Sequence, residues 1–247
     1  MKKRLDILIF EKGLVDSREK GQRLIMAGLV SVDSKKETKS GSKFDEDVKI
    51  DIEETSKYVG RGAEKMEGAY KAFRIDFKGK IVADIGSSTG GFTDFALQHG
   101  AARVYAIDVG TGQLHWRLRN DPRVVVMEKT DFRKIEELPE RIDIFLIDVS
   151  FLSVRKILEH LKSIKYKVLS IKQDTEIIAL FKPQFEAGKL TADRFRGVIK
   201  DPKIHERLLK EFRCWCEENG FKLLGQVQSP LLGAKGNTEF LFHLKLA

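Results

Sequence analysis

The sequence of 247 residues is poor in features that mark secreted, membrane and metal-dependent proteins. Its two cysteines, Cys214 and Cys216, lie two positions apart in a helical pattern, where their side chains diverge. Such a pair fits neither a disulfide framework nor a four-ligand zinc site, and the five histidines show no ligand spacing. No window approaches the ~18 apolar residues of a membrane span, and no signal-peptide pattern follows Met1. We therefore expect a cytoplasmic protein with no metal and no membrane partner.

The most informative stretch, Val82 to Phe92, is an apolar run that ends in an acid and opens into a glycine-rich turn. It lacks the G-x-G-x-x-G spacing that seats a dinucleotide pyrophosphate, and it lacks the lysine of a P-loop. Gly86 allows a sharp turn off a strand, and Gly90 and Gly91 allow the backbone to come close to a ligand. With both phosphate interpretations excluded, a nucleoside ligand without phosphate remains, and S-adenosylmethionine is the common one.

Charge is plentiful and unevenly distributed. The formal net charge is +8, which favours a polyanion such as nucleic acid as partner, although a charge-rich surface of the thermophile type is an alternative. Residues 1–43 carry 11 basic and 6 acidic side chains, whereas residues 44–60 carry 2 and 6. An acidic segment therefore follows a basic N-terminal unit and marks its end in the sequence.

The pattern of this N-terminal unit predicts a small α+β domain. Two short helices, the second opening at Ser17, precede strands over residues 29–32 and 48–52, with a turn over residues 33–36. The ends of the helices present basic and polar side chains that we expect to bind RNA. These are Lys3, Arg4, Ser17, Arg18, Lys20 and Arg23. A solvated helical face without a ligand is the alternative interpretation.

From Lys80 onward, strand and helix patterns alternate, as in a doubly wound parallel sheet. Strands are predicted over residues 81–85, 104–108, 124–127, 142–149 and 176–181, and helices over residues 92–99, 113–119, 154–162 and 202–219. Two final strands, over residues 221–228 and 238–245, are separated by a loop too short for a parallel crossover, so the last strand should run antiparallel. We therefore predict an α/β, Rossmann-like methyltransferase sheet, mostly parallel with one antiparallel strand.

Acidic residues lie at or just beyond the ends of four predicted strands, where ligands bind in open α/β sheets. Asp108 lies 24 residues after Asp84, near the ~20-residue spacing at which a carboxylate can bind a ribose. Asp131 is placed to meet the adenine amino group, with a helix N-cap as the alternative. The predicted cofactor-binding residues are Asp84, Gly86, Ser87, Ser88, Gly90, Gly91, Phe92, Asp108, Asp131 and Asp148.

Asp148 and Lys182 each end a strongly apolar segment that reads as a buried strand. A lysine or a carboxylate in such a place must be paired or functional. We predict that the two face each other across the cleft, and a purely structural ion pair is the alternative.

These segments resemble, over almost the full length, the TlyA-type family, whose members are known both as hemolysins and as rRNA 2′-O-methyltransferases. The residues that carry the resemblance are Arg4-Leu5-Asp6, Ser17-Arg18-Glu19, Arg61-Gly62-Ala63-Glu64-Lys65, Gly86 to Thr93, Asp121-Pro122-Arg123-Val124, Phe181-Lys182-Pro183-Gln184-Phe185-Glu186 and Gly236-Asn237-Thr238-Glu239. It implies an alpha-L RNA-binding domain of the ribosomal-protein-S-four type with a linker (residues 1–60) and an FtsJ-like methyltransferase domain (residues 61–247). Arg61 joins the expected RNA-binding set.

The resemblance further implies a catalytic tetrad of Lys65, Asp148, Lys182 and Glu239, S-adenosyl-L-methionine as cofactor, and rRNA or ribosomal subunits as partner. The implied reaction is 2′-O-methylation of a cytidine ribose in 16S rRNA, 23S rRNA or both. Lys182 would act as general base or as electrostatic partner of the developing alkoxide, Asp148 would orient it, and Glu239 would hold Lys65. A membrane-active hemolysin and an RNA-binding protein with an inactive methyltransferase domain remain alternatives.

One departure from the family pattern lies in the N-terminal unit. The predicted turn reads Val32-Asp33-Ser34-Lys35, where relatives tend to carry an Asn-Gly type of turn. We expect this difference to affect how tightly the small domain is built, and to leave the tetrad intact.

Overall fold

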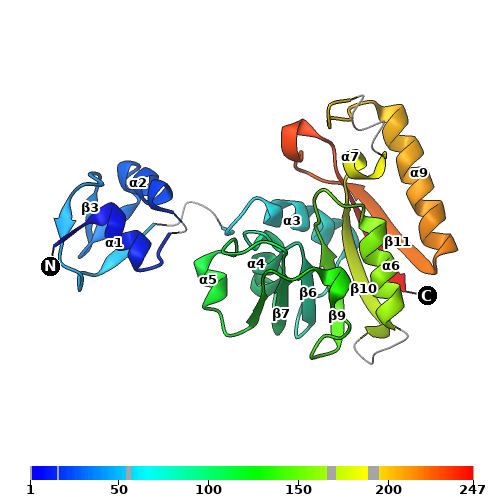
Figure 1. Ribbon diagram of the computed structural model, residues 1–247, viewed down its shortest axis with the longest axis horizontal. Helices are drawn as coiled ribbons and strands as arrows, with labels where there is room; N and C mark the ends of the chain where they lie inside the picture. The colour runs from blue at the N-terminus through cyan, green and yellow to red at the C-terminus, as the bar shows by residue number, and fades with distance from the viewer. Residues whose placement is uncertain (1, 16, 54–56, 166–170, 189–194, 247) are drawn as a thin grey trace. The chain divides into compact units, whose positions relative to one another are not determined.

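The computed structural model describes residues 2–15, 17–53, 57–165, 171–188 and 195–246. The chain divides into two compact units (Figure 1). The smaller unit comprises Met1–Lys57 with His115–Asn120, and the larger comprises Tyr58–Leu114 with Asp121–Ala247. Each unit contains its own cluster of buried hydrophobic side chains.

The smaller unit packs two helices against a three-stranded antiparallel sheet of order β3-β2-β5. Its elements are β1 (Lys3–Arg4), α1 (Leu5–Glu11), α2 (Arg18–Met26), β2 (Val30–Val32), β3 (Lys35–Glu37), β4 (Lys43–Phe44) and β5 (Ile50–Ile52). Leu5 and Ile9 of α1 meet Ile25 of α2 and Val30 of β2 in the core. The predicted α+β character of this unit is confirmed.

The turn between β2 and β3 is tighter than the sequence predicted. It is formed by Asp33 and Ser34 alone, because Lys35 already pairs with Val32 across the hairpin. Both turn residues have positive φ, 47° and 66°. Two consecutive residues in this conformation are typical of a type I′ turn, which Asn-Gly forms with little strain and Asp-Ser forms with more.

A seven-stranded sheet of order β11-β12-β10-β9-β6-β7-β8 forms the centre of the larger unit. Its strands are β6 (Ile81–Ile85), β7 (Arg103–Ile107), β8 (Val124–Met127), β9 (Ile142–Ile147), β10 (Ile171–Phe181), β11 (Phe221–Gln228) and β12 (Phe240–Leu246). Neighbouring strands from β8 to β10 are parallel, whereas β12 runs antiparallel to both β10 and β11. The predicted mostly parallel sheet with an antiparallel last strand is confirmed.

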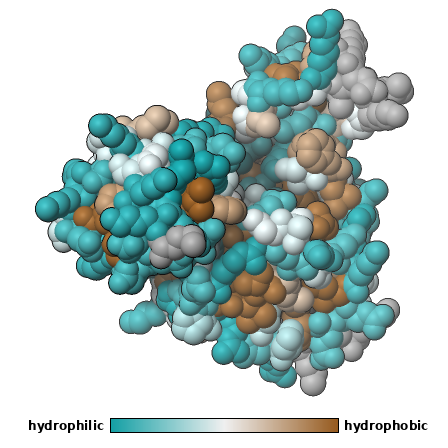
Figure 2. All heavy atoms as spheres, turned by 60° about the vertical axis from the view of Figure 1, so that its left-hand side comes forward, coloured by the Kyte–Doolittle hydropathy of each residue, from teal (hydrophilic) through white to brown (hydrophobic). Residues whose placement is uncertain are grey.

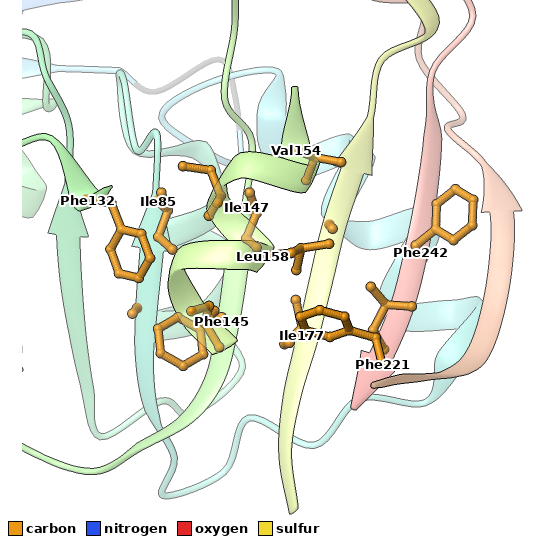
Figure 3. Close-up of a cluster of buried hydrophobic side chains, with 14 of the residues drawn as sticks. Ile85, Phe132, Phe145, Ile147, Val154, Leu158, Ile177, Phe221 and Phe242 are labelled. Atoms are coloured by element: carbon orange, nitrogen blue, oxygen red, sulfur yellow. The ribbon is translucent and has the colours of Figure 1, made fainter. Parts of the chain in front are cut away.

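Helices cover both faces of this sheet (Figure 1). They are α3 (Gly62–Phe73), α4 (Gly91–Gln98), α6 (Val154–Lys165), α7 (Pro183–Glu186) and α9 (Pro202–Glu218), with the 3-10 turns η1 (Phe132–Lys134) and η2 (Ala234–Gly236). On one face, Val154 and Leu158 of α6 lie over β9 and β10, which carry Ile147 and Ile177 (Figure 3). The packed layers hold the carboxyl ends of the strands rigidly, which is what a binding site at that edge requires.

The helix α3 was not among the predicted elements. Its buried side is made of Ala63, Met66 and Ala69, small or unbranched residues that give a weak hydrophobic pattern but favour helix. The helix ends at Arg74, which adopts the left-handed conformation with φ 55°.

The helix predicted over residues 113–119 is much shorter, and only α5 (Trp116–Arg119) forms. The backbone N–H groups of Gly112 and Gln113 donate instead to the carboxylate of Glu128, at 2.8 and 3.1 Å. A side chain distant in sequence therefore competes with the helix for its first donors.

Candidate functional site

Two adjoining cavities open at the carboxyl ends of β6, β7 and β9. The smaller, about 290 Å³, is lined by the start of α3 with Arg61 and Lys65, by the glycine-rich loop, and by residues 231–234. The larger, about 470 Å³, is lined by the residues that follow β7, β8 and β9. Gly86, Ser88 and Asp148 line both cavities, so a single elongated ligand can occupy the pair.

The glycine-rich loop has the backbone that its sequence predicts. Gly86 has φ +84°, and a Cβ there would collide with the backbone carbonyl oxygen of Asp148. Gly90 has φ 96° and is the N-cap residue of α4. At Gly91 a Cβ would lie 2.9 Å from the backbone nitrogen of Ala63. Gly91 is therefore required for the close packing of α4 on α3, in addition to its place in the cavity wall.

Asp84 is a fully buried carboxylate on the wall of the smaller cavity. The hydroxyl of Thr93 donates to its Oδ2 at 2.6 Å, while its Oδ1 is buried and has no hydrogen-bond partner among the described residues. Burial, with a further contribution from the charge of Asp148, raises the pKa of Asp84 to about 7. A buried carboxylate oxygen without a donor is suited to receive a cationic group of a ligand.

Asp108 and Asp131 both line the larger cavity, but their local contacts differ. Asp108 accepts hydrogen bonds from the backbone N–H groups of Ser88 at 2.8 Å and Gly110 at 2.7 Å, which ties the glycine-rich loop to the end of β7. Asp131 is the N-cap of η1 and pairs with Arg133 at 2.7 Å, which lowers the pKa of its carboxyl group. The N-cap alternative is thus present in the structure, and the adenine contact stays a prediction.

The four residues of the predicted tetrad form two ion pairs. Lys182 Nζ lies 2.6 Å from Asp148 Oδ1, and Lys65 Nζ lies 2.7 Å from Glu239 Oε2. The Lys182 and Glu239 side chains are almost fully buried, at 7% and 3% exposure. Lys65 and Asp148, one from each pair, line the smaller cavity together. Glu239 fits only because Gly233 has no side chain, since a Cβ there would overlap its carboxylate.

In the smaller unit, the two arginines predicted to bind RNA are organised by one buried carboxylate. Asp6 is fully buried and accepts hydrogen bonds from Arg4 Nε at 3.0 Å, Arg18 Nε at 3.0 Å and Gln22 Nε2 at 2.7 Å. These donors hold the pKa of Asp6 well below its usual range, against the opposing effect of burial. The arginine side chains are 41% and 45% exposed, so each remains partly accessible to solvent.

The other residues predicted to bind RNA in this unit have more ordinary surroundings. Lys3 pairs with Glu11 at 2.8 Å, and Arg23 is exposed on α2. The Ser17 hydroxyl accepts from the backbone N–H of Lys20 at 3.2 Å and so caps α2. A structural role is therefore present at Ser17, and RNA contact stays a prediction at all of these positions.

Three residues of these clusters were not selected from the sequence. Asp6 and Thr93 lie within the motifs Arg4-Leu5-Asp6 and Gly86 to Thr93, which carry the family resemblance, so the sequence did point to these positions. Ser150, whose hydroxyl accepts a hydrogen bond from Lys182 Nζ at 2.9 Å, gave no signal in the sequence.

Neither a membrane span nor a metal cluster occurs among the residues described. No helix there combines the length and the hydrophobicity needed to cross a bilayer. No group of three or more His, Cys, Asp or Glu side chains is arranged to hold a metal ion in the same ranges. The face shown in Figure 2 is largely hydrophilic, with scattered hydrophobic patches.

Comparison with known families assigns both parts of the chain. A family model for FtsJ-like methyltransferases matches residues 58–246, and a model for S4 domains matches residues 3–50. YqxC of Bacillus subtilis, named as a candidate rRNA methyltransferase, is 44% identical over 98% of this chain and 85% of its own length. The 16S/23S rRNA (cytidine-2′-O)-methyltransferase TlyA of Mycobacterium tuberculosis is 38% identical over 98% of this chain and 89% of its own.

A solved structure from Streptococcus thermophilus, named as a candidate hemolysin, has the same fold. It superposes with a TM-score of 0.71 at 39% identity, and the match covers all of this chain and 89% of that one. The resemblance stated from the sequence motifs is therefore confirmed.

Proposed function

This chain belongs to the family of FtsJ-like methyltransferases with an N-terminal S4 domain, and we propose that it methylates a ribose 2′-hydroxyl of rRNA. Residues 1–60 would form the RNA-binding domain and linker, and residues 61–247 the methyltransferase domain. The substrate would be a cytidine of 16S rRNA, 23S rRNA or both, by analogy with the tuberculosis relative. The observation that carries the proposal is the pairing of both tetrad lysines with their carboxylates at the wall of one cavity.

The residues around the two cavities fit S-adenosylmethionine, which when bound supplies a methyl group on a positively charged sulfur. Asp84 Oδ1, buried and without a donor among the described residues, is suited to the ligand's ammonium group. Asp108, which lines the larger cavity, would bind the ribose, and Asp131 the adenine amino group. The remaining predicted contacts, Ser87, Ser88, Gly90, Gly91 and Phe92, come from the loop and the start of α4.

A ribose 2′-hydroxyl is a weak nucleophile and must lose its proton as its oxygen gains the methyl group. Lys182 would take this proton or stabilise the negative charge that develops on the oxygen. Asp148, at 2.6 Å, holds Lys182 in place, and Glu239 holds Lys65 at 2.7 Å. Because both lysines are already fixed by ion pairs, little reorganisation is needed when the hydroxyl arrives.

RNA would be held by the basic side chains of the smaller unit together with Arg61. Arg4 and Arg18 have partly exposed side chains, and their guanidinium groups are suited to bind phosphate. Contacts of this kind give binding that weakens steeply with salt. Since the proposed substrate is rRNA, the cytoplasm is the proposed location.

Methyl transfer from tritiated S-adenosylmethionine to purified ribosomal subunits tests the proposal directly. We expect Lys182→Ala to lower the transfer rate by about 10²–10³-fold, because the developing charge loses its partner. Lys156→Ala, at an exposed lysine of α6, is the matched control and should behave as wild type. A Lys182→Ala rate within a few-fold of wild type would overturn the assignment.

Two alternatives are separated by simple measurements. A hemolysin would lyse erythrocytes as purified, detergent-free protein, and we expect no lysis. An RNA-binding protein with an inactive catalytic domain would fail to bind S-adenosylmethionine in calorimetry. The complete tetrad and the intact glycine-rich loop argue against such decay.

A further inference from the structure

The loops that follow the neighbouring strands β9 and β10 are joined by a row of side-chain contacts. The contacts are Asp148 with Lys182 at 2.6 Å, Lys182 with Ser150 at 2.9 Å, the rings of Phe151 and Phe185 with centroids 5.3 Å apart, and Ser153 with Glu186 at 2.7 Å. The order of the contacts follows both loops in the same direction. These contacts join the two loops, and at one end of the row Lys182 is paired with Asp148, which lines both cavities.

In this row Lys182 makes two of the contacts, one with Asp148 and one with Ser150. A lysine ammonium sits on a flexible four-carbon stem and presents three donors. The ion pair with Asp148 holds one of these donors, and Nζ lies 5.8 Å from the centroid of the Phe185 ring, but neither contact sets the direction of the remaining donors. The hydrogen bond that Lys182 donates to Ser150 Oγ supplies a second fixed point and so sets the direction.

The backbone after Ser150 is in an unfavourable conformation. Phe151 has φ 62°, a left-handed conformation that bulky residues rarely adopt, and its side chain is 92% exposed. Burial of this phenylalanine therefore offsets little of the strain. Such strain persists where the surroundings impose it, and it is concentrated at functional sites. Here the turn coincides with the hydrogen bond of Ser150 to Lys182 and the contact of Phe151 with Phe185.

We propose that Ser150 is a positioning residue for Lys182, acting through the hydrogen bond that its hydroxyl accepts from Lys182 Nζ. The proposal rests on the methyl-transfer function proposed above. Ser150 contributes alignment of the lysine toward the attacking hydroxyl. Ser150 is exposed and lines the larger cavity, whereas the Lys182 side chain that it contacts is almost fully buried.

The test compares Ser150→Ala with Ser150→Thr in methyl transfer to ribosomal subunits. We expect Ser150→Ala to lower kcat by about tenfold, the effect of about 1.4 kcal/mol, with KM for S-adenosylmethionine within about twofold of wild type. In the wild-type protein this hydrogen bond stabilises the charged ammonium of Lys182. Its removal should therefore move the pH–kcat profile toward lower pH. Ser150→Thr, which keeps the hydroxyl, should restore both kcat and the profile.

Ser153→Ala is the matched control, since this serine lies in the same loop but donates to Glu186. It should lower thermal stability without moving the pH–kcat profile. If Ser150→Ala keeps the wild-type kcat and profile, or if Ser150→Thr fails to rescue, the positioning role is wrong. Inactive wild-type protein would instead contradict the methyl-transfer function itself.

A crystal structure of Ser150→Ala gives a readout that needs no activity. We expect Lys182 Nζ to lose its single position beside Asp148 and to occupy at least one other. An unchanged, single position of Nζ would overturn the proposal even if the proposed reaction were another.

Discussion

Two aspartates, one in each unit, are completely buried, and their pKa values move in opposite directions. Asp6 in the smaller unit accepts hydrogen bonds from two arginines and a glutamine, and these donors keep its pKa low despite burial. Asp84 in the larger unit accepts from a threonine hydroxyl, and burial raises its pKa to about 7. Neither carboxylate has exposed surface, but Asp84 lies much deeper in its unit than Asp6 does. The two also differ in their partners, since among the described residues only Asp6 is paired with cations of the chain.

The two carboxylates therefore differ in whether their charge is compensated by side chains of the protein. A buried carboxylate is costly unless it is paired, and at Asp6 the cost is offset within the fold. Asp84 lines a cavity and its buried Oδ1 has no donor among the described residues, so the cost is relieved by protonation, which is why the pKa is raised. The same residue type thus organises arginines in one unit, and in the other it lines a cavity without a cationic partner among the described residues.

Removing the carboxylate of Asp6 should have the largest effect on stability. We expect Asp6→Ala to lower the free energy of unfolding of the smaller unit by about 3 kcal/mol, because four hydrogen bonds to one carboxylate, three of them from arginines, are lost. Hydrogen exchange measured by mass spectrometry on peptides from residues 3–52 reports this locally. Peptides from the larger unit serve as the internal control, and uniform protection in both units would contradict the prediction.

The neutral substitution Asp84→Asn should give the opposite result. It keeps an acceptor for Thr93 and removes a charge that nothing in the described chain compensates. We expect the protein without cofactor to be as stable as wild type or slightly more so, while affinity for S-adenosylmethionine falls by about 10- to 100-fold, or about 1.4–2.7 kcal/mol. Isothermal titration calorimetry and thermal unfolding together test both halves. A drop in stability with unchanged affinity would reverse the assignment of the two aspartates.

The raised pKa of Asp84 also predicts a pH dependence. Since the folded protein holds this proton more tightly than the unfolded chain, the stabilising contribution is complete below about pH 4 and is lost as the pH rises through about 7. Cofactor binding, which favours ionised Asp84, should therefore raise the unfolding temperature more at pH 8 than at pH 6, by the equivalent of about 1 kcal/mol. The Asp84→Asn protein should show no such difference. An equal shift at both pH values in wild type would count against Asp84 as the cation receptor.

Much of this arrangement could be predicted from the sequence where local pattern determines it. The antiparallel last strand followed from the short loop before β12, and the contact between Asp148 and Lys182 followed from the ends of two apolar segments. The pairing of Lys65 with Glu239, 174 positions apart, came only from family resemblance.

What could not be predicted depends on backbone geometry or on weak patterns. The contact of Ser150 with Lys182 occurs beside a left-handed turn at Phe151, which no propensity indicates. The helix α3 was missed because its buried face is made of alanines and a methionine. The opposite pKa shifts of Asp6 and Asp84 could not be predicted without the full set of donors around each carboxylate, because in the sequence both are simply acidic residues within or beside a motif.

The two units also differ in where residues other than glycine adopt a strained, left-handed backbone conformation, and this difference should have the smallest effect on stability. In the larger unit the strained Phe151 lines the larger cavity, whereas in the smaller unit Ser34, with φ 66°, lies in the hairpin turn between β2 and β3. Glycine adopts this conformation freely, so Ser34→Gly should raise the stability of the smaller unit by about 0.5–1 kcal/mol and leave RNA binding unchanged. Ser31→Gly, within β2, is the control and should destabilise by a similar amount, because glycine weakens a strand. Hydrogen exchange of residues 30–37 distinguishes the two, and equal effects of both substitutions would show that the turn carries no strain.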